Sequence, residues 1–312
     1  MMKRAIITGA TGMIGIALIN RLLKEDIEIT AVVRPNSKRA GRIPKNSKIK
    51  IVECELSSLD TLKEILEKEY SYFFHFGWGS TFGDGRNNMP VQIENIMATI
   101  RAVELARVLG CSVFVGAGSQ AEYGRVEGTL TPNTPTNPEN GYGMAKLCAG
   151  QMSRVLCEKY NIKHIWMRIL SIYGPNDGMH TMVMSGMNQM HRGERPSYTK
   201  GEQMWDYLYC EDAAEAMYLA AIKTAKQSAV YCLGSGKVRP LADYITDIRD
   251  VVSPGSDIGF GEVPYFDKQV MYLCADIQSL RDDTGFEPKT TFKDGIKKTY
   301  EWLKEELKNE EN

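Results

Sequence analysis

The sequence predicts an α/β protein in which a doubly wound parallel sheet is followed by a smaller C-terminal lobe. Short apolar runs alternate with stretches of helical periodicity through the first two-thirds of the chain. Such alternation is typical of a parallel sheet with helices on both faces. A glycine-rich turn lies between the first strand and the first helix, and the alternation breaks beyond Pro175. We therefore expect one domain over residues 1–175 and a lobe over residues 176–312.

Seven strands are expected, six of them before this boundary. They span Ala5–Thr8, Glu28–Val33, Lys50–Glu53, Tyr72–Phe76, Val113–Val115, His164–Ile169 and Ala229–Leu233. The expected helices span Met13–Lys24, Leu59–Lys68, Val91–Leu109, Gly141–Lys159, Met179–Arg192, Ala213–Lys223, Leu241–Val251 and a last segment from Phe292. The C-terminal lobe is therefore discontinuous, and part of it is expected to return to the main sheet.

The glycine-rich turn after the first strand indicates a Rossmann-type dinucleotide site. Its three glycines have the spacing GxxGxxG instead of the GxGxxG of the standard fingerprint. Glycines at such a turn let backbone N–H groups approach a pyrophosphate at the positive end of the following helix. The residues expected to contact the cofactor here are Gly9, Thr11, Gly12, Met13, Ile14 and Gly15.

Tyr142 and Lys146 form a YxxxK pair, with Ser119 lying 23 residues before the tyrosine. On a helix the two side chains leave the same face. A nearby ammonium favours the phenolate and lowers a tyrosine pKa that starts near about 10. Such a tyrosine can exchange a proton with a carbonyl or alcohol oxygen at neutral pH. Alone, the pair could equally be a helical surface contact, so its meaning depends on the rest of the chain.

Further motifs extend along nearly the whole chain. They are Val113–Ser119, Glu122–Gly124, Asn95, Arg168–Pro175, Trp205–Tyr209, Glu211–Ala214, Ala275–Asp276, Gly285–Pro288 and Trp302. With these motifs the chain resembles the extended short-chain dehydrogenase/reductase family, the nucleotide-sugar epimerases, dehydratases and reductases. The resemblance implies an NAD(P)-dependent enzyme that acts on a nucleotide-diphosphate sugar. Its catalytic residues would be Ser119, which hydrogen-bonds the reacting oxygen, Tyr142 as acid and base, and Lys146, which also holds the nicotinamide ribose.

The resemblance implies contacts to both ligands elsewhere in the chain. For the cofactor these are Phe76, Gly77, Trp78, Asn95, Leu170 and Ile172, besides Tyr142 and Lys146. For the substrate they are Ser80, Thr81, Gln120, Ser171 and Trp205. Phe76, Gly77 and Trp78 replace the small apolar triplet that is usual in the family.

The segment after the second strand favours NADP(H), with NAD(H) as the alternative. No acidic residue occurs between Ile29 and Val52, where an NAD-preferring enzyme carries one for the adenosine ribose. Arg34, Ser37 and either Lys38 or Arg39 could bind a 2′-phosphate, although a solvated basic loop is also possible. Glu55 and Leu56 occupy the place where the family usually has an Asp-Leu pair that contacts the adenine.

Departures from the family pattern restrict the reaction. Dehydratases of the family carry Asp-Glu directly after the catalytic Ser or Thr, where this chain has Gln120 and Ala121, so we expect no 4,6-dehydration. Ser171 stands where the family usually has an asparagine, and Trp205 stands where it usually has an arginine that binds the diphosphate. Trp205 either stacks on a base or packs in the lobe. Reduction of a 4-keto(-6-deoxy) sugar is favoured, with 4-epimerisation on a tightly bound NAD as the alternative. A non-enzymatic NADP(H) sensor is a more distant alternative.

The composition restricts partners and location. The net charge of −1 gives no general attraction to nucleic acid or membranes. Seven scattered cysteines, without a CxxC pair, predict buried reduced thiols and no metal site. The absence of a signal peptide or apolar span predicts a cytoplasmic protein. The family resemblance further implies a homodimer formed by the helices Val91–Leu109 and Gly141–Lys159, although Ile96, Ile100, Val103 and Ala106 could equally face the sheet.

Overall fold

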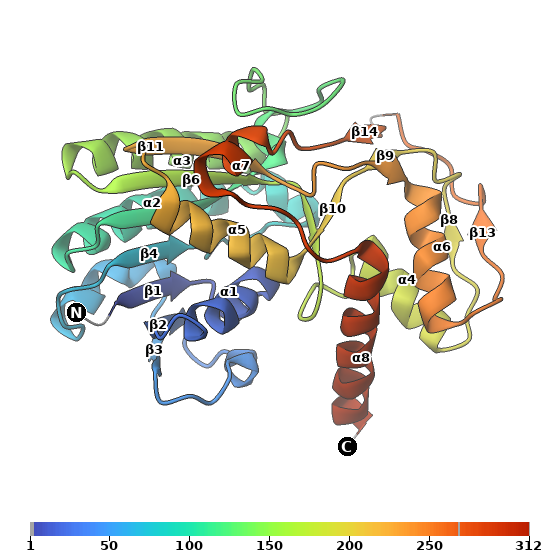
Figure 1. The fold of residues 1–312 in the computed structure, drawn as a ribbon, viewed down its shortest axis with the longest axis horizontal. Helices are drawn as coiled ribbons and strands as arrows, with labels where there is room; N and C mark the ends of the chain where they lie inside the picture. The colour runs from blue at the N-terminus through green and yellow to red at the C-terminus, as the bar shows by residue number, and fades with distance from the viewer. Residues whose placement is uncertain (1–2, 268, 312) are drawn as a thin grey trace.

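The computed structural model describes residues 3–267 and 269–311 and contains a seven-stranded, fully parallel central sheet (Figure 1). Its order is β11-β6-β5-β4-β1-β2-β3. The strands span Arg4–Thr8 (β1), Glu28–Val33 (β2), Ile49–Glu53 (β3), Tyr72–His75 (β4), Val113–Ser119 (β5), Lys163–Ile169 (β6) and Ser228–Leu233 (β11). The strand order reverses between β1 and β4, and ligands of doubly wound sheets bind beyond the carboxyl ends of the strands at this point. The predicted fold class is confirmed.

Helices cover both faces of the sheet. One layer consists of α1 (Met13–Leu23), α5 (Cys210–Lys223) and α7 (Gln278–Thr284). The other consists of α2 (Met89–Val108), α3 (Gly141–Lys159) and the 3₁₀ segment η2 (Leu56–Glu64). Because both faces are covered, consecutive apolar residues of a strand point to opposite cores. Ile6 and Phe73 belong to the core beneath α2, whereas Ile7 and Phe74 belong to the core beneath α1.

Two predicted elements differ from the structure by more than three residues at one end or in the type of helix. The expected helix over Leu59–Lys68 is the 3₁₀ segment η2, with non-helical dihedral angles at Ser58. Within it only Leu59 and Leu62 are buried, and this spacing of three suits the three residues per turn of a 3₁₀ helix. The expected strand Val113–Val115 continues to Ser119, because β6 pairs with β5 up to this residue.

The segment after Ile169 forms a lobe beside the sheet and also returns to it. The lobe contains α4 (Met182–His191), α6 (Leu241–Val252) and α8 (Phe292–Glu311), at the right of Figure 1. Its short strands are β7 (Ser171–Tyr173), β8 (Ser197–Tyr198), β9 (Met204–Trp205), β10 (Tyr207–Tyr209), β12 (Arg239–Pro240), β13 (Gly259–Phe260) and β14 (Tyr272–Leu273). From the same half of the chain, α5, β11 and α7 pack into the main domain.

Two further expectations concern the whole chain. Within the described residues, no helix has the length and apolar character required to cross a bilayer. The seven cysteines are free thiols, and all except the half-buried Cys148 are buried.

Candidate active site

The glycine turn between β1 and α1 forms a tight backbone cradle. Gly9 has a φ of +69°, and a Cβ there would lie 2.7 Å from the backbone of Phe76 and Gly77. A Cβ on Gly15 would lie 2.4 Å from the carbonyl oxygen of Gly9, so both positions require glycine. Gly12, at the N-cap of α1, offers no capping side chain, and the first turn carries no acidic residue. The positive end of the helix is thus free to bind an anionic group.

A cavity of about 800 Å³ extends from this cradle across the point where the strand order reverses. Among the predicted site residues, its lining includes Gly9, Thr11, Gly12, Arg34, Glu55, Leu56, Phe76, Gly77, Trp78, Ser80, Thr81 and Asn95. Residues that were predicted to contact the cofactor but lie outside this lining are Met13, Ile14, Gly15, Ser37, Lys38, Tyr142, Lys146, Leu170 and Ile172. Met13, Ile14, Leu170 and Ile172 instead pack with the apolar core.

The basic end of the cavity carries Arg34, directly after β2, and Arg39. Of the two residues that the sequence left open, Arg39 lines the cavity and Lys38 does not. Arg42, from the same basic stretch, forms an ion pair with Glu306 at 3.3 Å. Among the described residues, Arg34 and Arg39 form no ion pair, which leaves their guanidinium groups available to an anionic ligand.

Polar side chains of α2 hold the loop that follows β4. The Asn95 amide accepts a hydrogen bond from the N–H of Gly79 at 2.8 Å and donates one to its carbonyl oxygen at 2.9 Å. Gln92 accepts a hydrogen bond from the indole N–H of Trp78 at 3.0 Å and donates to the carbonyl oxygen of Ser80 at 3.0 Å. Asn95 therefore contributes to the cavity chiefly by fixing this loop, and it orients Trp78 together with Gln92.

The three predicted catalytic residues come from β5 and α3. Ser119 ends β5, and Tyr142 and Lys146 lie in the first turns of α3, which Asn140 caps by accepting from the N–H of Gly143 at 2.9 Å. The ammonium of Lys146 donates to the carbonyl oxygen of Ala117 at 2.6 Å. It also lies 3.7 Å from the centre of the Trp78 ring, so Trp78 connects these residues to the cavity.

The charges of this group differ from the sequence-based expectation. Burial lowers the pKa of Lys146 to about 7, although the negative charge of Glu122 acts in the opposite direction. Burial also raises the pKa of Tyr142 above its usual value, and this outweighs the hydrogen bond with Ser119 and the positive charge of Arg86. The expectation of a lowered pKa for Tyr142 is therefore wrong for this structure, because burial outweighs the groups that favour the phenolate. Tyr142 is a phenol at neutral pH.

Two residues beside the site were missed by the sequence analysis. Arg86, in the 3₁₀ segment η3 (Gly83–Asn87), places its guanidinium carbon 4.8 Å from the centre of the Tyr142 ring. Its Nε atom is buried and has no hydrogen-bond partner among the described residues. His75 ends β4 and contacts the hydroxyl groups of Thr8 at 2.8 Å and Thr99 at 3.3 Å. Burial and Lys146 lower the pKa of His75 to about 3, so it is neutral. The position of His75 near the end of a predicted strand was a signal that sequence analysis could have used, whereas the sequence around Arg86 has no pattern that points to a site.

The residues that were predicted to bind the substrate fall into two groups. Ser80 and Thr81 lie in the cavity lining after β4. Ser171 and Trp205 lie on β7 and β9, where the indole N–H of Trp205 donates to the Ser171 hydroxyl at 2.8 Å. Trp205 is half-buried and packs against the core, one of the two alternatives left open. Gln120 begins the 3₁₀ segment η4 (Gln120–Glu122), half-buried beside Ser119.

Comparisons with known proteins find a matching family and several relatives. The model of the family described as NAD dependent epimerase/dehydratase matches residues 5–234. A trifunctional UDP-glucose 4,6-dehydratase/UDP-4-keto-6-deoxy-D-glucose 3,5-epimerase/UDP-4-keto-L-rhamnose-reductase of Arabidopsis thaliana is 28% identical over 96% of this chain and 47% of the relative. The chain thus spans about half the length of this relative. CDP-abequose synthase of Salmonella typhimurium is 22% identical over 93% of this chain and 95% of the relative.

Solved structures show the same fold. The UDP-N-acetylglucosamine 4-epimerase of Methanobrevibacter ruminantium superimposes with a TM-score of 0.87, at 21% identity, over 98% of this chain and 99% of the other. The UDP-glucose 4-epimerase of Thermotoga maritima superimposes with a TM-score of 0.85, at 20% identity, over 97% of this chain and 99% of the other.

Proposed function

The chain belongs to the NAD dependent epimerase/dehydratase family, and we propose that it is an NADPH-dependent reductase of a 4-keto nucleotide sugar. The observation that carries the proposal is the basic end of the cavity. Arg34 directly follows β2, where the adenosine ribose binds in this fold, and Arg39 joins it in the cavity lining. A 2′-phosphate would give these unpaired guanidinium groups an anionic partner.

The cradle at the other side of the cavity fits the pyrophosphate of a nicotinamide dinucleotide. Gly9 and Gly15 leave no room for side chains, so the backbone N–H groups and the uncapped end of α1 remain accessible. When bound, the cofactor would supply the hydride for the reduction.

The protein would supply the proton. Tyr142 is protonated at neutral pH because its pKa is raised, and a phenol is the form needed to donate to the oxygen of a keto group during reduction. Ser119 hydrogen-bonds Tyr142 and would share the reacting oxygen with it. Lys146, held by the carbonyl oxygen of Ala117, would bind the nicotinamide ribose and stabilise the phenolate that remains after proton transfer.

The residues after Ser119 argue against dehydration. Gln120 is half-buried and Ala121 is buried, and neither can ionise at the place where dehydratases of the family carry an acid and a base. The name of the Arabidopsis relative includes a UDP-4-keto-L-rhamnose reductase besides a 4,6-dehydratase and a 3,5-epimerase, and the Salmonella relative is named CDP-abequose synthase.

4-Epimerisation on a bound NAD is the second candidate. The same serine, tyrosine and lysine would serve it, since it passes through the same 4-keto sugar. A 23% identical relative from Methanocaldococcus jannaschii is named a putative UDP-glucose 4-epimerase, and the two solved structures are 4-epimerases. A non-enzymatic sensor is less well supported, because it would have no use for the three catalytic residues.

A cofactor and substrate assay distinguishes these functions. Purified protein would be mixed with UDP-, CDP-, GDP- and dTDP-4-keto-6-deoxy sugars and NADPH or NADH, and the loss of cofactor absorbance followed. A reductase consumes one NADPH for each keto sugar. Release of NAD from the denatured protein, together with interconversion of UDP-glucose and UDP-galactose without net cofactor consumption, would instead establish the epimerase. Binding of NADPH without turnover of any of these sugars would favour the sensor.

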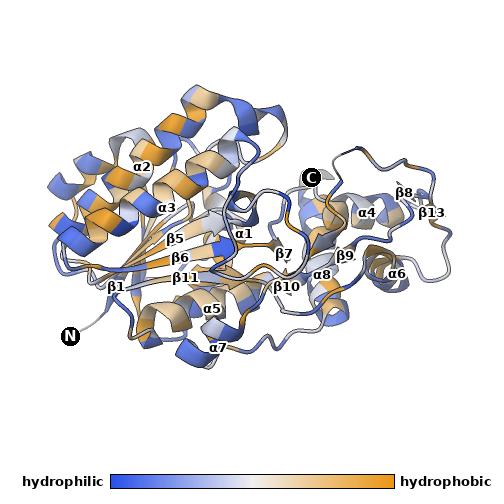
Figure 2. Ribbon diagram, turned by 90° about the horizontal axis from the view of Figure 1, so that it is seen from above, coloured by the Kyte–Doolittle hydropathy of each residue, from blue (hydrophilic) through white to orange (hydrophobic). Residues whose placement is uncertain are grey.

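We also propose that the protein is a homodimer through α2 and α3. These helices expose apolar side chains that are 41% to 58% accessible, which Figure 2 shows as apolar positions along both helices. They are Met89, Ile93 and Met97 on α2 and Met144, Met152 and Val155 on α3. Of the stripe considered from the sequence, Val103 and Ala106 are fully buried, and Ile96 and Ile100 are half-buried. The exposed set is therefore the one available to a second copy.

A further inference from the structure

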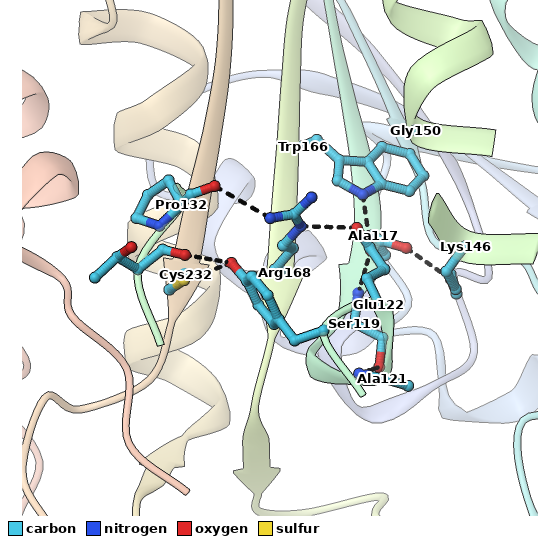
Figure 3. A network of polar contacts seen from close by, with 12 residues as sticks. Ala117, Ser119, Ala121, Glu122, Pro132, Lys146, Gly150, Trp166, Arg168 and Cys232 are labelled. Atoms are coloured by element: carbon cyan, nitrogen blue, oxygen red, sulfur yellow. Dashed lines mark hydrogen bonds and ion pairs between the residues drawn. The ribbon is translucent and has the colours of Figure 1, made fainter. Parts of the chain in front are cut away.

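A buried carboxylate lies directly behind the proposed catalytic serine. Figure 3 shows that Glu122 accepts hydrogen bonds from the backbone N–H of Ser119 at 2.8 Å, the indole N–H of Trp166 at 2.9 Å and the Nε of Arg168 at 2.7 Å. Glu122 is 0% exposed. A buried carboxylate is destabilising unless it is paired and hydrogen-bonded. The three donors provide these interactions for Glu122.

Glycines around Glu122 and Trp166 leave room for these two side chains. A Cβ on Gly118 would lie 2.5 Å from the Glu122 carboxylate and 2.4 Å from the Trp166 indole nitrogen. A Cβ on Gly116 would lie 2.3 Å from the same indole ring, and one on Gly150 of α3 would lie 2.7 Å from it. The end of β5 thus requires glycines so that the indole and the carboxylate can pack against its backbone.

Arg168 is fixed on its other side. It donates to the carbonyl oxygen of Pro132 at 3.2 Å, and its guanidinium lies 4.5 Å from the centre of the Tyr123 ring. Tyr123 in turn donates to the carbonyl oxygen of Thr131 at 2.8 Å. The carboxylate therefore has a rigid cationic partner.

We propose that Glu122 is a positioning residue that fixes the end of β5, and with it both Ser119 and the carbonyl oxygen that holds Lys146. The inference rests on the proposed catalytic roles of these two residues. Glu122 pins the N–H of Ser119, while Ala117, two residues earlier on the same strand, accepts from the Lys146 ammonium. One carboxylate thereby sets the separation between two of the three catalytic side chains.

The charge of Glu122 has a second effect at the same site. Around Lys146, Tyr142 lies on its own helix, Trp78 comes from the segment after β4, and His75 ends that strand. Arg86 lies over the Tyr142 ring, and Arg168 on β6 is the cation paired with Glu122. His75 is neutral and Arg86 is positive, so neither favours an ammonium. Glu122 is the anion whose charge raises the pKa of Lys146 against the effect of burial.

The test uses Glu122→Gln in the 312-residue chain. The carbonyl oxygen of glutamine can replace the acceptor for Ser119, but its amide group then faces the N–H of Arg168. We expect kcat to fall about 10- to 100-fold, the equivalent of one charge-assisted hydrogen bond, with KM changed less than about threefold. We expect the alkaline limb of the pH profile to move down by about one pH unit, because Lys146 loses its proton earlier.

A titration without substrate separates this inference from the proposed function. Carbon NMR of selectively labelled lysine, with the Lys146 signal identified by Lys146→Met, measures the midpoint directly. We expect it to be about one pH unit lower in Glu122→Gln than in the wild type. An unchanged midpoint would overturn the charge effect, and an unchanged kcat would overturn the positioning role. If no nucleotide sugar is turned over, the proposed function fails while the titration still decides the effect of Glu122 on Lys146.

Two further variants guard against misfolding and general effects. Glu122→Gln combined with Arg168→Met leaves no unpaired guanidinium, so it is expected to fold and to recover part of kcat. A double variant that folds and recovers none of the lost kcat would count against the positioning role. Glu28→Gln removes a carboxylate paired with Arg4 at 3.0 Å at the opposite end of the sheet and should alter neither measurement.

Discussion

The indole N–H of Trp205 on β9 donates a 2.8 Å hydrogen bond to the hydroxyl of Ser171 on β7. These are the two positions at which the chain replaces an arginine and an asparagine expected from the family resemblance. Because the two replacements contact each other, the departures from the family pattern are structurally coupled. The lobe gains a link between two short strands at the place where a diphosphate contact was expected.

This link predicts a coupled effect on stability. Trp205→Phe and Ser171→Ala should each lower the free energy of unfolding by about 1 kcal/mol, through loss of one hydrogen bond. The double variant should be at least as stable as the less stable of the two single variants. Urea denaturation measures the free energy of unfolding of all three. Fully additive losses would show that the hydrogen bond contributes nothing of its own.

Tyr142→Phe should retain cofactor binding and lose most turnover. The ring still packs between Trp78 and Arg86, and only the transferable proton is removed. We expect kcat to fall by about 10²-fold or more. Steady-state kinetics with NADPH, together with a thermal-shift titration of the cofactor, provide both measurements. A variant with near-normal kcat would remove Tyr142 from the mechanism.

Lys146→Met should stabilise the fold at neutral pH while it impairs function. Burial lowers the pKa of Lys146 to about 7, well below the value of 10.5 for an ordinary lysine. Between these values the unfolded chain binds the additional proton, so the wild-type free energy of unfolding rises with pH through this range and is lowest towards pH 7. Removing the amine should therefore raise the free energy of unfolding on the order of 3 kcal/mol near pH 7. It should also flatten the dependence on pH.

The same variant loses a ribose contact and the stabilisation of the phenolate, so both activity and cofactor affinity should fall. Urea denaturation at neutral and alkaline pH checks the stability, and a cofactor titration checks the binding. A variant that is less stable than the wild type near neutral pH would show that Lys146 is not destabilised by its burial.

Arg34→Asp should change the cofactor preference. The guanidinium–phosphate contact contributes about 1.5–3 kcal/mol, and an aspartate adds repulsion while it can accept from the ribose hydroxyls of NADH. We expect the ratio of kcat/KM for NADPH to that for NADH to fall more than about tenfold. Arg42→Asp is the matched control, because Arg42 belongs to the same basic stretch but pairs with Glu306. NAD in the purified protein, with no response of either cofactor to Arg34→Asp, would favour the epimerase.

Charges on the exposed apolar face should separate the proposed dimer. Ile93→Glu combined with Val155→Glu places two carboxylates at positions that are 58% and 55% exposed, on α2 and α3 respectively. In sedimentation velocity experiments we expect the wild type to be a dimer and the variant a monomer. Ile65→Glu, at a 60% exposed position outside these helices, should leave the assembly unchanged. A monomeric wild type would overturn the proposal.

The sequence was sufficient to predict the succession of strands and helices along the chain, but not the local conformation of every segment. The boundaries of α3 and β2 agree with the prediction at both ends, because caps and apolar runs are local signals. Leu59–Lys68 was predicted as an ordinary helix, yet only a short apolar stripe is buried and a 3₁₀ segment forms over Leu56–Glu64. Its conformation depends on packing against α2, which periodicity alone does not encode.

By itself, the sequence determined the parallel α/β fold, the glycine cradle and the group of Ser119, Tyr142 and Lys146, since residue spacing or short motifs predict each of them. Only the tertiary structure decided the charges of that group, because burial depends on every element packed around it. It also placed Arg86 against the Tyr142 ring and Glu122 behind Ser119. These contacts join loops and strands far apart in the chain, and their energies depend on distances and desolvation that no local pattern contains.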